Sequence, residues 1–468
     1  MSNSRITMEE LVSQQLPVRR QVLGILLLSI PAIISQLGTI VMEYIDASMV
    51  GSLGADASAA IGLSASTTWL LGGMTTAAAS GFSVQIAQYI GAGQRDEARR
   101  LFKQALPMVL LFSSGLLIFM ALASPHIPVW LGGEPVLRHD AGMYLLIYGL
   151  SLPFVQLIGL GSAVLQCSGN IRLPSILNVS RCGLDVIYNL FLIYPARNIH
   201  IGSASFLMPG AGLGVTGAAL GTALSEVTVA LIIMVILCLR HPLFRLRRQD
   251  SWLIRPVSLK TAVRISVPIA LERAAFSGAL VVVTSIISPL GSVALAANSF
   301  AVTAEGLCYM PGYGLGSTAT ALVGQSIGAG KPAQARRYAF ITVGLGMVLM
   351  GLSGAFMYAV CPYVFMFLTP VTAIQALAVR ILRLEIIAEP FYGASIVASG
   401  ALTGAGDTLM PGLMNLASIW GVRLPLSLIL VGRFGLVGVW AAMCIELFFR
   451  GAIFLIRLIR GKWMKKII

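Results

Sequence analysis

The sequence predicts an all-α polytopic membrane protein, with twelve transmembrane helices in two six-helix lobes related by a pseudo-twofold axis along the membrane normal. Three observations lead to this fold class. Only 11% of the 468 residues are charged, whereas an average soluble protein has about 25%. Twelve apolar runs are long enough to cross a bilayer, and the second half of the chain repeats the first. The composition excludes a soluble multidomain enzyme and a disordered chain.

Each predicted span has about the 20 predominantly apolar residues that a helix needs to cross the hydrocarbon core. The spans lie at 21–46, 58–88, 104–124, 142–165, 174–195, 213–239, 262–288, 293–322, 339–362, 379–402, 411–431 and 436–458. Ten-residue stretches of alternating apolar and polar residues are absent, which argues against an outer-membrane barrel. The first run is too long for the core of a signal peptide, so we expect it to remain as a span.

The spans divide the chain into five segments. They are a cytoplasmic N-terminal segment (1–20), an N-lobe (21–239), a basic cytoplasmic linker (240–261), a C-lobe (262–458) and a basic cytoplasmic tail (459–468).

The net charge of +14 is carried by cations that cluster between the apolar runs. The predicted outer loops contain only Arg138, Arg197 and Arg433, whereas the inner segments hold most of the others. By the positive-inside rule both termini are cytoplasmic, and a bacterial inner membrane is the expected location. Because the cations do not form one surface, nucleic acid is not expected as a partner.

Motifs of catalysis and cofactor binding are missing from the sequence. There is no phosphate-binding G-x-x-x-x-G-K-[ST], no H-E-x-x-H and no nucleophile elbow. The six cysteines are scattered through apolar runs without a C-x-x-C pair, which is typical of small buried side chains and not of disulfides or metal ligands. The sequence therefore predicts no enzyme, no cofactor and no structural metal.

The internal repeat keeps one offset in residue number, 237, over most of its length. Ile90–Gly93 recurs as Ile327–Gly330, and Leu165–Asn178 matches Leu402–Asn415, both at this offset. Near the end of each half the offset falls to 221, so the first half carries 16 extra residues around 196–213. Six spans per repeat give both halves the same orientation, and such repeats enclose a central cleft in which transporters bind their substrates. A purely structural duplication is the alternative.

Nine of the 18 acidic residues fall within predicted spans. A charge at the bilayer centre costs about 2.5–3.5 kcal/mol on insertion scales, so these acids must face the cleft, face one another or carry a proton. They are Glu43, Asp46, Asp185, Glu226, Glu272, Glu305, Glu385, Glu389 and Glu446.

Two acids on the first span and one on the fifth are candidates for ion coupling. Glu43 and Asp46 are three residues apart and share a helix face. Asp185 shares a face with Asn189, and Arg181, one turn earlier, is expected to neutralise it if the site is only a local ion pair. For Glu43 the alternative is an anchor at the membrane interface.

On the seventh and eighth spans, Glu272 and Glu305 are predicted to lie deep in the membrane. Glu272 is about ten residues into its span, or about 15 Å deep, and follows Pro268, which loosens the helix. Arg273 is adjacent but points elsewhere on the helix, so it is not an obvious partner for Glu272.

The acids of the last spans suggest structural pairs. Glu385 lies one turn from Glu389 and is expected to pair with Arg380 and Arg383. Glu446 and Arg450 have i,i+4 spacing, and we expect them to form a structural ion pair. No strong acid is kept in both halves at the offset of 237, as expected if each lobe took on a separate task.

Four stretches carry a resemblance to a known family, namely Tyr44–Gly54, Gln88–Arg100, Val323–Arg337 and Ser399–Pro411. They resemble signatures of the multidrug and toxic compound extrusion (MATE) family, in both halves and at the family's positions. The resemblance implies a twelve-helix, V-shaped antiporter that exports organic, often cationic compounds in exchange for protons or sodium ions.

The resemblance also implies roles for individual residues. Asp46 matches the span-1 aspartate of the family's N-lobe cation site. Asp185 and Asn189 match the family's span-5 pattern with the two residue types exchanged, because Asp185 occupies the usual Asn position and Asn189 the usual Asp position. Glu272 matches the span-7 glutamate of the NorM-like branch, and the span-10 aspartate of that branch falls at Tyr392. These matches make Asp46, Asp185, Asn189 and Glu272 the predicted coupling residues, with Glu43, Glu305, Glu389 and Tyr392 as further substrate or coupling candidates.

We therefore predict a secondary antiporter of organic compounds, with a small organic substrate and the lipid bilayer as partners, H⁺ or Na⁺ as the coupling ion, and a monomeric state. One alternative is a dedicated exporter of a single metabolite or toxin. Another is a flippase for a lipid-linked precursor, which would need a strongly cationic cleft, whereas here the span acids outnumber the span arginines. A non-transporting structural or receptor protein is the third.

Overall fold

The computed structural model describes residues 7–14, 16–201, 204–247, 251–253 and 255–464. The start of the predicted N-terminal segment (1–6) and the end of the predicted basic tail (465–468) lie outside the described residues.

The first half of the chain forms the N-lobe helices and one hairpin. Its elements are α1 (Met8–Ser13), α2 (Val18–Gly51), α3 (Ala55–Gly91), α4 (Arg95–Ala123), α5 (Ile127–Trp130), α6 (Pro135–Cys167), α7 (Arg172–Leu192), β1 (Pro195–Ile201), β2 (Ala204–Ala211), α8 (Gly214–Val235) and the π-helical turn η1 (Ile236–Arg240).

The second half repeats this arrangement without the hairpin. Its elements are α9 (Pro256–Ile287), the 3₁₀ turn η2 (Ser288–Leu290), α10 (Ser292–Gly328), α11 (Pro332–Leu368), α12 (Thr372–Glu385), the 3₁₀ turn η3 (Ile386–Ala388), α13 (Glu389–Gly404), α14 (Leu409–Ser418), the π-helical turn η4 (Ile419–Arg423), α15 (Leu424–Phe434) and α16 (Leu436–Arg460).

Each of the twelve predicted spans coincides with a long helical segment, which confirms the predicted fold class. Nine helices of the described residues are long and apolar enough to cross a membrane. The other three predicted spans are α3, α7 and the α12–η3–α13 segment. They are less apolar because α3 is rich in Ala, Ser, Thr and Gly, and the other two carry charged residues within the helix. The exact lobe boundaries stay a prediction.

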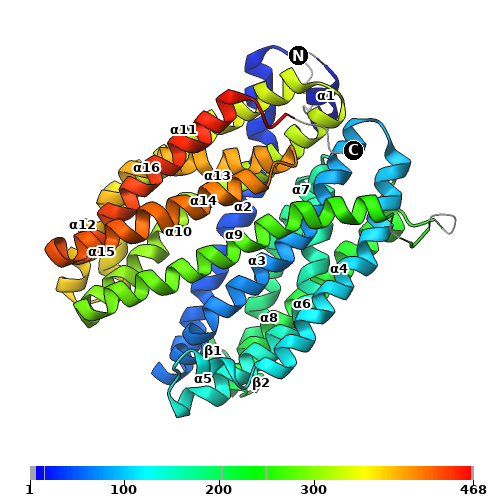
Figure 1. The fold of residues 1–468 in the computed structure, drawn as a ribbon. Coiled ribbons are helices and arrows are strands. Elements are labelled where there is room, and N and C mark those ends of the chain that lie inside the picture. The colour runs from blue at the N-terminus through cyan, green and yellow to red at the C-terminus, as the bar shows by residue number, and fades with distance from the viewer. Residues whose placement is uncertain (1–6, 15, 202–203, 248–250, 254, 465–468) are drawn as a thin grey trace.

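The two lobes meet at one end and separate at the other (Figure 1). They converge where α1 and the C-terminal end of α16 lie, which we call the closed end. At the opposite, open end, α5 and the β1–β2 hairpin of the N-lobe lie far from α12 and α15 of the C-lobe. The first helix of each half contacts both lobes, because α2 packs against α7 and α10, and α9 packs against α14 and α3.

At the closed end, α3 and α10 cross almost backbone to backbone. A Cβ on Gly91 would lie 1.9 Å from the carbonyl oxygen of Gln325, and one on Gly328 would lie 2.0 Å from that of Gln88. Only glycine permits this approach. The helices end shortly before Gly93 and Gly330, whose φ angles of +75° and +70° suit glycine at the end of a helix.

Two glutamines tie the lobes together beside this crossing. The Gln88 Nε2 donates to the carbonyl oxygen of Gly404 at 3.5 Å, and the Gln325 Nε2 donates to that of Cys167 at 2.5 Å. The two donors are related by the offset of 237, and so are the two acceptors. The closure is therefore symmetric, and we call these two bonds the glutamine clamp.

The short helix α1 bridges the lobes over the closed end. Lys331 and Gln334 of the C-lobe donate to its last carbonyl groups, with Lys331 Nζ 2.8 Å from the oxygen of Val12. Glu9 forms an ion pair with Arg95 of the N-lobe at 3.1 Å. The sequence predicts no role for the N-terminal segment, but in the structure its helix α1 connects the two lobes.

The extra residues of the first half form an antiparallel hairpin, β1 paired with β2, between α7 and α8 at the open end. The sequence analysis locates this insertion but predicts no strands there. The hairpin therefore accounts for the change in the repeat offset between α7 and α8.

Candidate functional site

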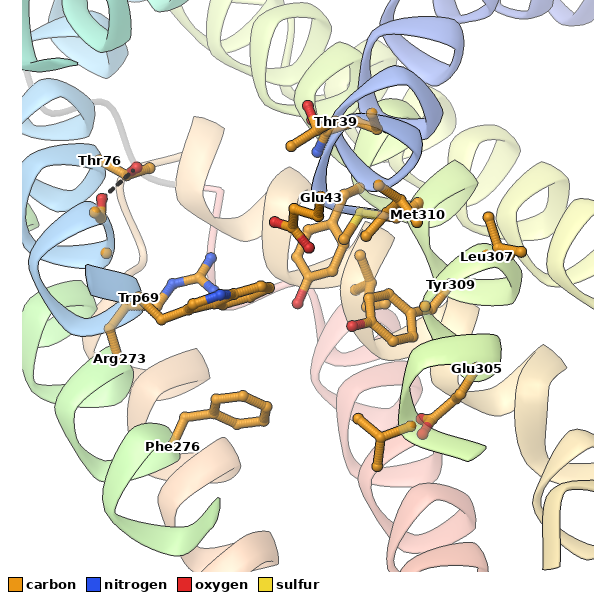
Figure 2. Close-up of a pocket in the computed structure, with 18 of the residues that line it drawn as sticks. Thr39, Glu43, Trp69, Thr76, Arg273, Phe276, Glu305, Leu307, Tyr309 and Met310 are labelled. Carbon is orange, nitrogen blue, oxygen red and sulfur yellow. Dashed lines mark hydrogen bonds between the residues drawn. The ribbon is translucent and has the colours of Figure 1, made fainter. Parts of the chain in front are cut away.

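A large cavity of about 2330 Å³ lies between the lobes and reaches from the glutamine clamp region toward the open end. Both halves contribute to its walls, mainly through α2, α3 and α6 of the N-lobe and α9, α10 and α13 of the C-lobe. Figure 2 shows Glu43 and Thr39 extending into it from α2, Arg273 and Phe276 from α9, and Tyr309 and Glu305 from α10. We call this cavity the central cleft.

Beside the cleft, in the N-lobe, three predicted residues form one hydrogen-bonded group. The side-chain amide of Asn189 on α7 donates to Asp46 Oδ1 of α2 at 2.9 Å and to Asp185 Oδ2 at 3.0 Å. Asp185 and Asn189 are fully buried, and Asp46 is half-buried. An amide nitrogen has two hydrogens, so one Asn189 can donate to one oxygen of each carboxyl group.

Unsatisfied oxygen atoms make this N-lobe site suited to an ion. Asp185 Oδ1 and Asn189 Oδ1 are buried without a hydrogen-bond partner among the described residues. A buried polar atom without a partner is costly, and a bound proton or a hard cation such as sodium would satisfy it. The group therefore has both the charge and the vacant acceptors that ion binding requires.

The sequence analysis gives no signal for the third helix of this site. A Cβ on Gly221 of α8 would lie 2.0 Å from Asn189 Oδ1. The missing side chain at Gly221 leaves the space that the Asn189 amide occupies, so α8 determines where Asn189 can point.

The alternative in which Arg181 neutralises Asp185 in a local ion pair is wrong. Arg181 forms an ion pair with Glu226 of α8, not with Asp185. Asp185 and Arg181 share a helix face, as predicted, but the side chain of Arg181 reaches a neighbouring helix whose position the sequence does not reveal. Because Arg181 pairs with Glu226, Asp185 keeps Asn189 as its hydrogen-bond partner. The same ion pair explains how Glu226, for which the sequence suggests no partner, is accommodated within the membrane.

Three further candidates line the central cleft. Glu43 is exposed to it, Glu272 lies in its wall, and Glu305 lines it while remaining only 7% exposed. Glu272 Oε1 accepts a hydrogen bond of 2.7 Å from Asn415 of α14. The repeat could have indicated Asn415, because it is the counterpart of Asn178 at the offset of 237.

Tyr392 and Glu389 are close in sequence but face different surroundings. Tyr392 lines the cleft, and its ring packs against Tyr309 with centroids 5.6 Å apart. Glu389 is fully buried, and a Cβ on Gly354 of α11 would lie 3.3 Å from its Cβ, so its side chain packs toward α11. Both carboxyl oxygens of Glu389 lack a hydrogen-bond partner among the described residues.

The predicted pairing of Glu385 with Arg380 and Arg383 is wrong. Arg383 donates to the carbonyl oxygen of Tyr358 at 3.3 Å and lies over its ring. Glu385 is fully buried, and both of its carboxyl oxygens are unpartnered within the described chain. All three residues lie in the regular helix α12, and Glu385 is five residues after Arg380 and two after Arg383, spacings at which side chains do not face each other.

The predicted pair of Glu446 and Arg450 is confirmed. The Arg450 Nε and one of its terminal nitrogens each lie 2.7 Å from a carboxylate oxygen of Glu446, and Ser418 donates to the same carboxylate. Ser418 is the counterpart of Arg181 at the offset of 237. The two lobes therefore use equivalent helix positions to contact a buried glutamate, with an arginine in one lobe and a serine in the other.

The architecture and the sites define a multi-pass membrane protein with two pseudosymmetric six-helix lobes around a central cleft. The MatE family model matches residues 31–191 and 268–429, and the starts of the two matches differ by the same offset as the internal repeat. The chain belongs to the multidrug and toxic compound extrusion family, whose members are transporters and not enzymes.

Relatives match over nearly the whole chain. The chain is 29% identical to a probable multidrug resistance protein NorM of Thermotoga maritima, over 94% of this chain and 92% of the relative. It is 26% identical to the multidrug resistance protein PmpM of Pseudomonas aeruginosa, over 96% and 94% of the two chains.

Solved structures share the fold. A multidrug resistance MATE family transporter of the MOP superfamily in an outward-facing conformation has a TM-score of 0.88 at 20% identity, covering 98% of this chain and 99% of that one. A MOP superfamily transporter from Pyrococcus furiosus, described as having a binding pocket of reverse polarity that suggests a different function, has a TM-score of 0.88 at 19% identity, with the same coverage.

Proposed function

We propose that the protein is a secondary active antiporter that exports amphipathic organic compounds in exchange for H⁺ or Na⁺. The proposal rests on two findings taken together. The chain belongs to a family of transporters, and intramembrane acids border its central cleft. No catalytic or ATP-binding motif in the sequence offers another energy source.

The closed end faces the cytoplasm in this proposal, in a bacterial inner membrane. Arg95, Arg100, Arg336 and Arg337 follow the helix ends that meet there, and the positive-inside rule assigns such clusters to the cytoplasmic side. The cleft then opens to the outside, as needed for releasing substrate. We propose a monomer, because one chain supplies both walls of the cleft.

Ion coupling is assigned to the N-lobe site. Binding of a proton or sodium ion between Asp46, Asp185 and Asn189 changes the charge and the hydrogen bonds that hold α2 against α7. Because α2 also packs against α10 of the opposite lobe, a shift of α2 reaches the lobe interface. The ion and the substrate must prefer opposite states, since a ligand with equal affinity for both shifts nothing.

The C-lobe acids are proposed to assist in the cleft. Glu272 is held by Asn415, and its position in the wall suits contact with a cationic group of the substrate. Glu43 offers a second exposed carboxylate, and Trp69, Tyr309 and Phe276 supply aromatic surface against which a flat substrate can stack.

The rocking step requires the closed end to open. It must break the glutamine clamp and separate α1 from one of the lobes. The clamp is only two hydrogen bonds, each contributing about 1 kcal/mol, which suits a contact that forms and breaks in every cycle.

The test is flux in proteoliposomes under an imposed pH or sodium gradient, with a panel of dyes, fluoroquinolones and flavins. We expect gradient-driven uptake of at least one probe in vesicles where the cytoplasmic side faces out, and its loss in Asp46→Asn. Asp56→Asn, an exposed acid of α3, is the matched control. Absence of gradient-dependent flux for every probe would contradict the proposal.

A further inference from the structure

The charges that line the central cleft are of both signs. Four glutamates and four arginines contribute to its walls, namely Glu43, Glu226, Glu272, Glu305, Arg181, Arg273, Arg423 and Arg450. A cleft dedicated to simple organic cations would need only the acids. The arginines therefore require an explanation of their own.

Two of the four arginines have structural partners. Arg181 is paired with Glu226, and Arg450 with Glu446. Neither Arg423 nor Arg273 forms an ion pair with a carboxylate of the described chain. Of these two, the Arg423 Nε is buried without a hydrogen-bond partner among the described residues, whereas the side chain of Arg273 extends into the cleft in Figure 2.

The position of Arg273 is built by its neighbours. A Cβ on Gly73 of α3 would lie 3.0 Å from both Cβ and Cγ of Arg273, so the aliphatic part of the side chain lies in a slot over Gly73. Its guanidinium lies over the ring of Tyr313, 6.0 Å from the centroid. The adjacent acid, Glu272, is instead engaged by Asn415 at 2.7 Å. Arg273 extends into the cleft in Figure 2.

The chemistry of arginine makes this arrangement a binding site. A guanidinium keeps its charge under all physiological conditions, so it cannot avoid the cost of burial by releasing a proton. Its donors form a planar fork that matches the two oxygens of a carboxylate. A half-buried arginine that is held by a glycine slot and an aromatic ring, and with which no carboxylate of the described chain forms an ion pair, is prepared for an anionic group on a ligand.

We propose that Arg273 binds the acidic group of a zwitterionic aromatic substrate, whose basic group is accommodated by the acids of the same cleft. This inference rests on the proposed function, because it names the chemical class of the substrate. It makes Arg273 a specificity-determining residue: it favours compounds with a carboxylate over the esters of the same compounds.

A matched pair of dyes tests the inference. Rhodamine B carries a carboxylate and a delocalised cation, and its ethyl ester keeps the cation but lacks the anion. Binding of both is measured by fluorescence anisotropy with the full chain in nanodiscs. In Arg273→Gln we expect rhodamine B to bind about tenfold or more weakly, as for a lost charge-assisted hydrogen bond, with the binding of the ester unchanged.

Two further variants make the result specific. Arg273→Lys keeps the charge and should retain part of the preference for the carboxylate. Arg264→Gln removes an exposed arginine on the same helix, outside the cleft, and should behave as wild type.

The outcomes separate this inference from the proposed function. If Arg273→Gln weakens both dyes by the same factor, or if wild type binds the ester and not rhodamine B, the anion site is overturned while export of cations stands. If wild type shows no gradient-driven flux of either dye or of the wider panel, the proposed function fails, and this inference fails with it.

Discussion

In the N-lobe, two carboxyl groups from α2 and α7 meet at one bridging amide, whereas the acids of the C-lobe are spread over α9, α10, α12, α13 and α16 without sharing a partner. The backbone plan is common to both lobes, down to the paired bonds of the glutamine clamp. The duplication therefore preserved the closure of the protein while its ionisable side chains diverged.

We expect the largest difference between the lobes in the stability lost when a buried ion pair is broken. Glu446 is fully buried, so Glu446→Gln leaves the Arg450 charge uncompensated and should lower the stability by about 3–5 kcal/mol. Arg181 borders the cleft and is 17% exposed, so Glu226→Gln should cost less. Thermal unfolding of the purified protein measures both.

The control for these variants is Glu134→Gln, an exposed acid at the start of α6. The double variant Glu446→Leu, Arg450→Leu should be more stable than either single one, because no charge is left alone. A larger loss from Glu226→Gln than from Glu446→Gln would reverse the comparison.

Ion coupling should be concentrated in the N-lobe. Asp46→Asn and Asp185→Asn should each reduce ion-driven efflux by about tenfold or more while dye binding is retained, since a coupling free energy is typically about 1–3 kcal/mol. Glu272→Gln should mainly weaken substrate binding. Efflux rates and dye affinities in proteoliposomes separate the two effects. Intact coupling in both aspartate variants, with its loss in Glu272→Gln, would assign the ion to the C-lobe.

The spacing between α7 and α8 should matter as much as the acids themselves. In Gly221→Ala the new methyl group would lie 2.0 Å from Asn189 Oδ1, and the displaced amide should cost about 1–3 kcal/mol and weaken coupling. Gly183→Ala on α7 meets no atom within 4 Å and should be neutral or slightly stabilising. Equal behaviour of the two variants in unfolding and efflux assays would argue against a role for the Asn189 bridge.

We expect the smallest effect from changes in the glutamine clamp, which both lobes share. Gln88→Leu and Gln325→Leu each remove a clamp hydrogen bond that contributes about 1 kcal/mol, so each should raise the population that is open at the closed end by a similar factor. Spin labels at Arg100 and Arg337, exposed positions related by the offset of 237, measure this opening. Opening in only one variant would show that the closure is not symmetric.

Much of the fold follows from the sequence because bilayer thickness fixes the length of a span and the repeat fixes its order. Asp46, Asp185 and Asn189 can be grouped from helix periodicity together with the family resemblance. Periodicity gives the face of a helix but not the neighbour that the face meets. This is why the sequence points Arg181 toward Asp185, although its partner Glu226 lies on the adjacent helix.

Other features have separate causes. Glu385 does not meet its expected arginines because spacings of two and five residues do not face each other on a regular helix, and the hairpin replaces a loop of unspecified structure. Arg273 could not be recognised as a site because its slot is created by Gly73, a glycine far earlier in the chain. The surroundings of these residues depend on contacts between helices that are far apart in the chain, and a single sequence does not reveal such contacts.

The central claim is that the N-lobe site holds the coupling ion in competition with substrate bound in the cleft. The most direct measurement is ion release when saturating dye is added to the purified protein, read with a pH indicator in weak buffer and with radioactive sodium. We predict that wild type releases protons or sodium on dye binding and that the double variant Asp46→Asn, Asp185→Asn releases neither, although it still binds dye. Undiminished release in the double variant would contradict the account.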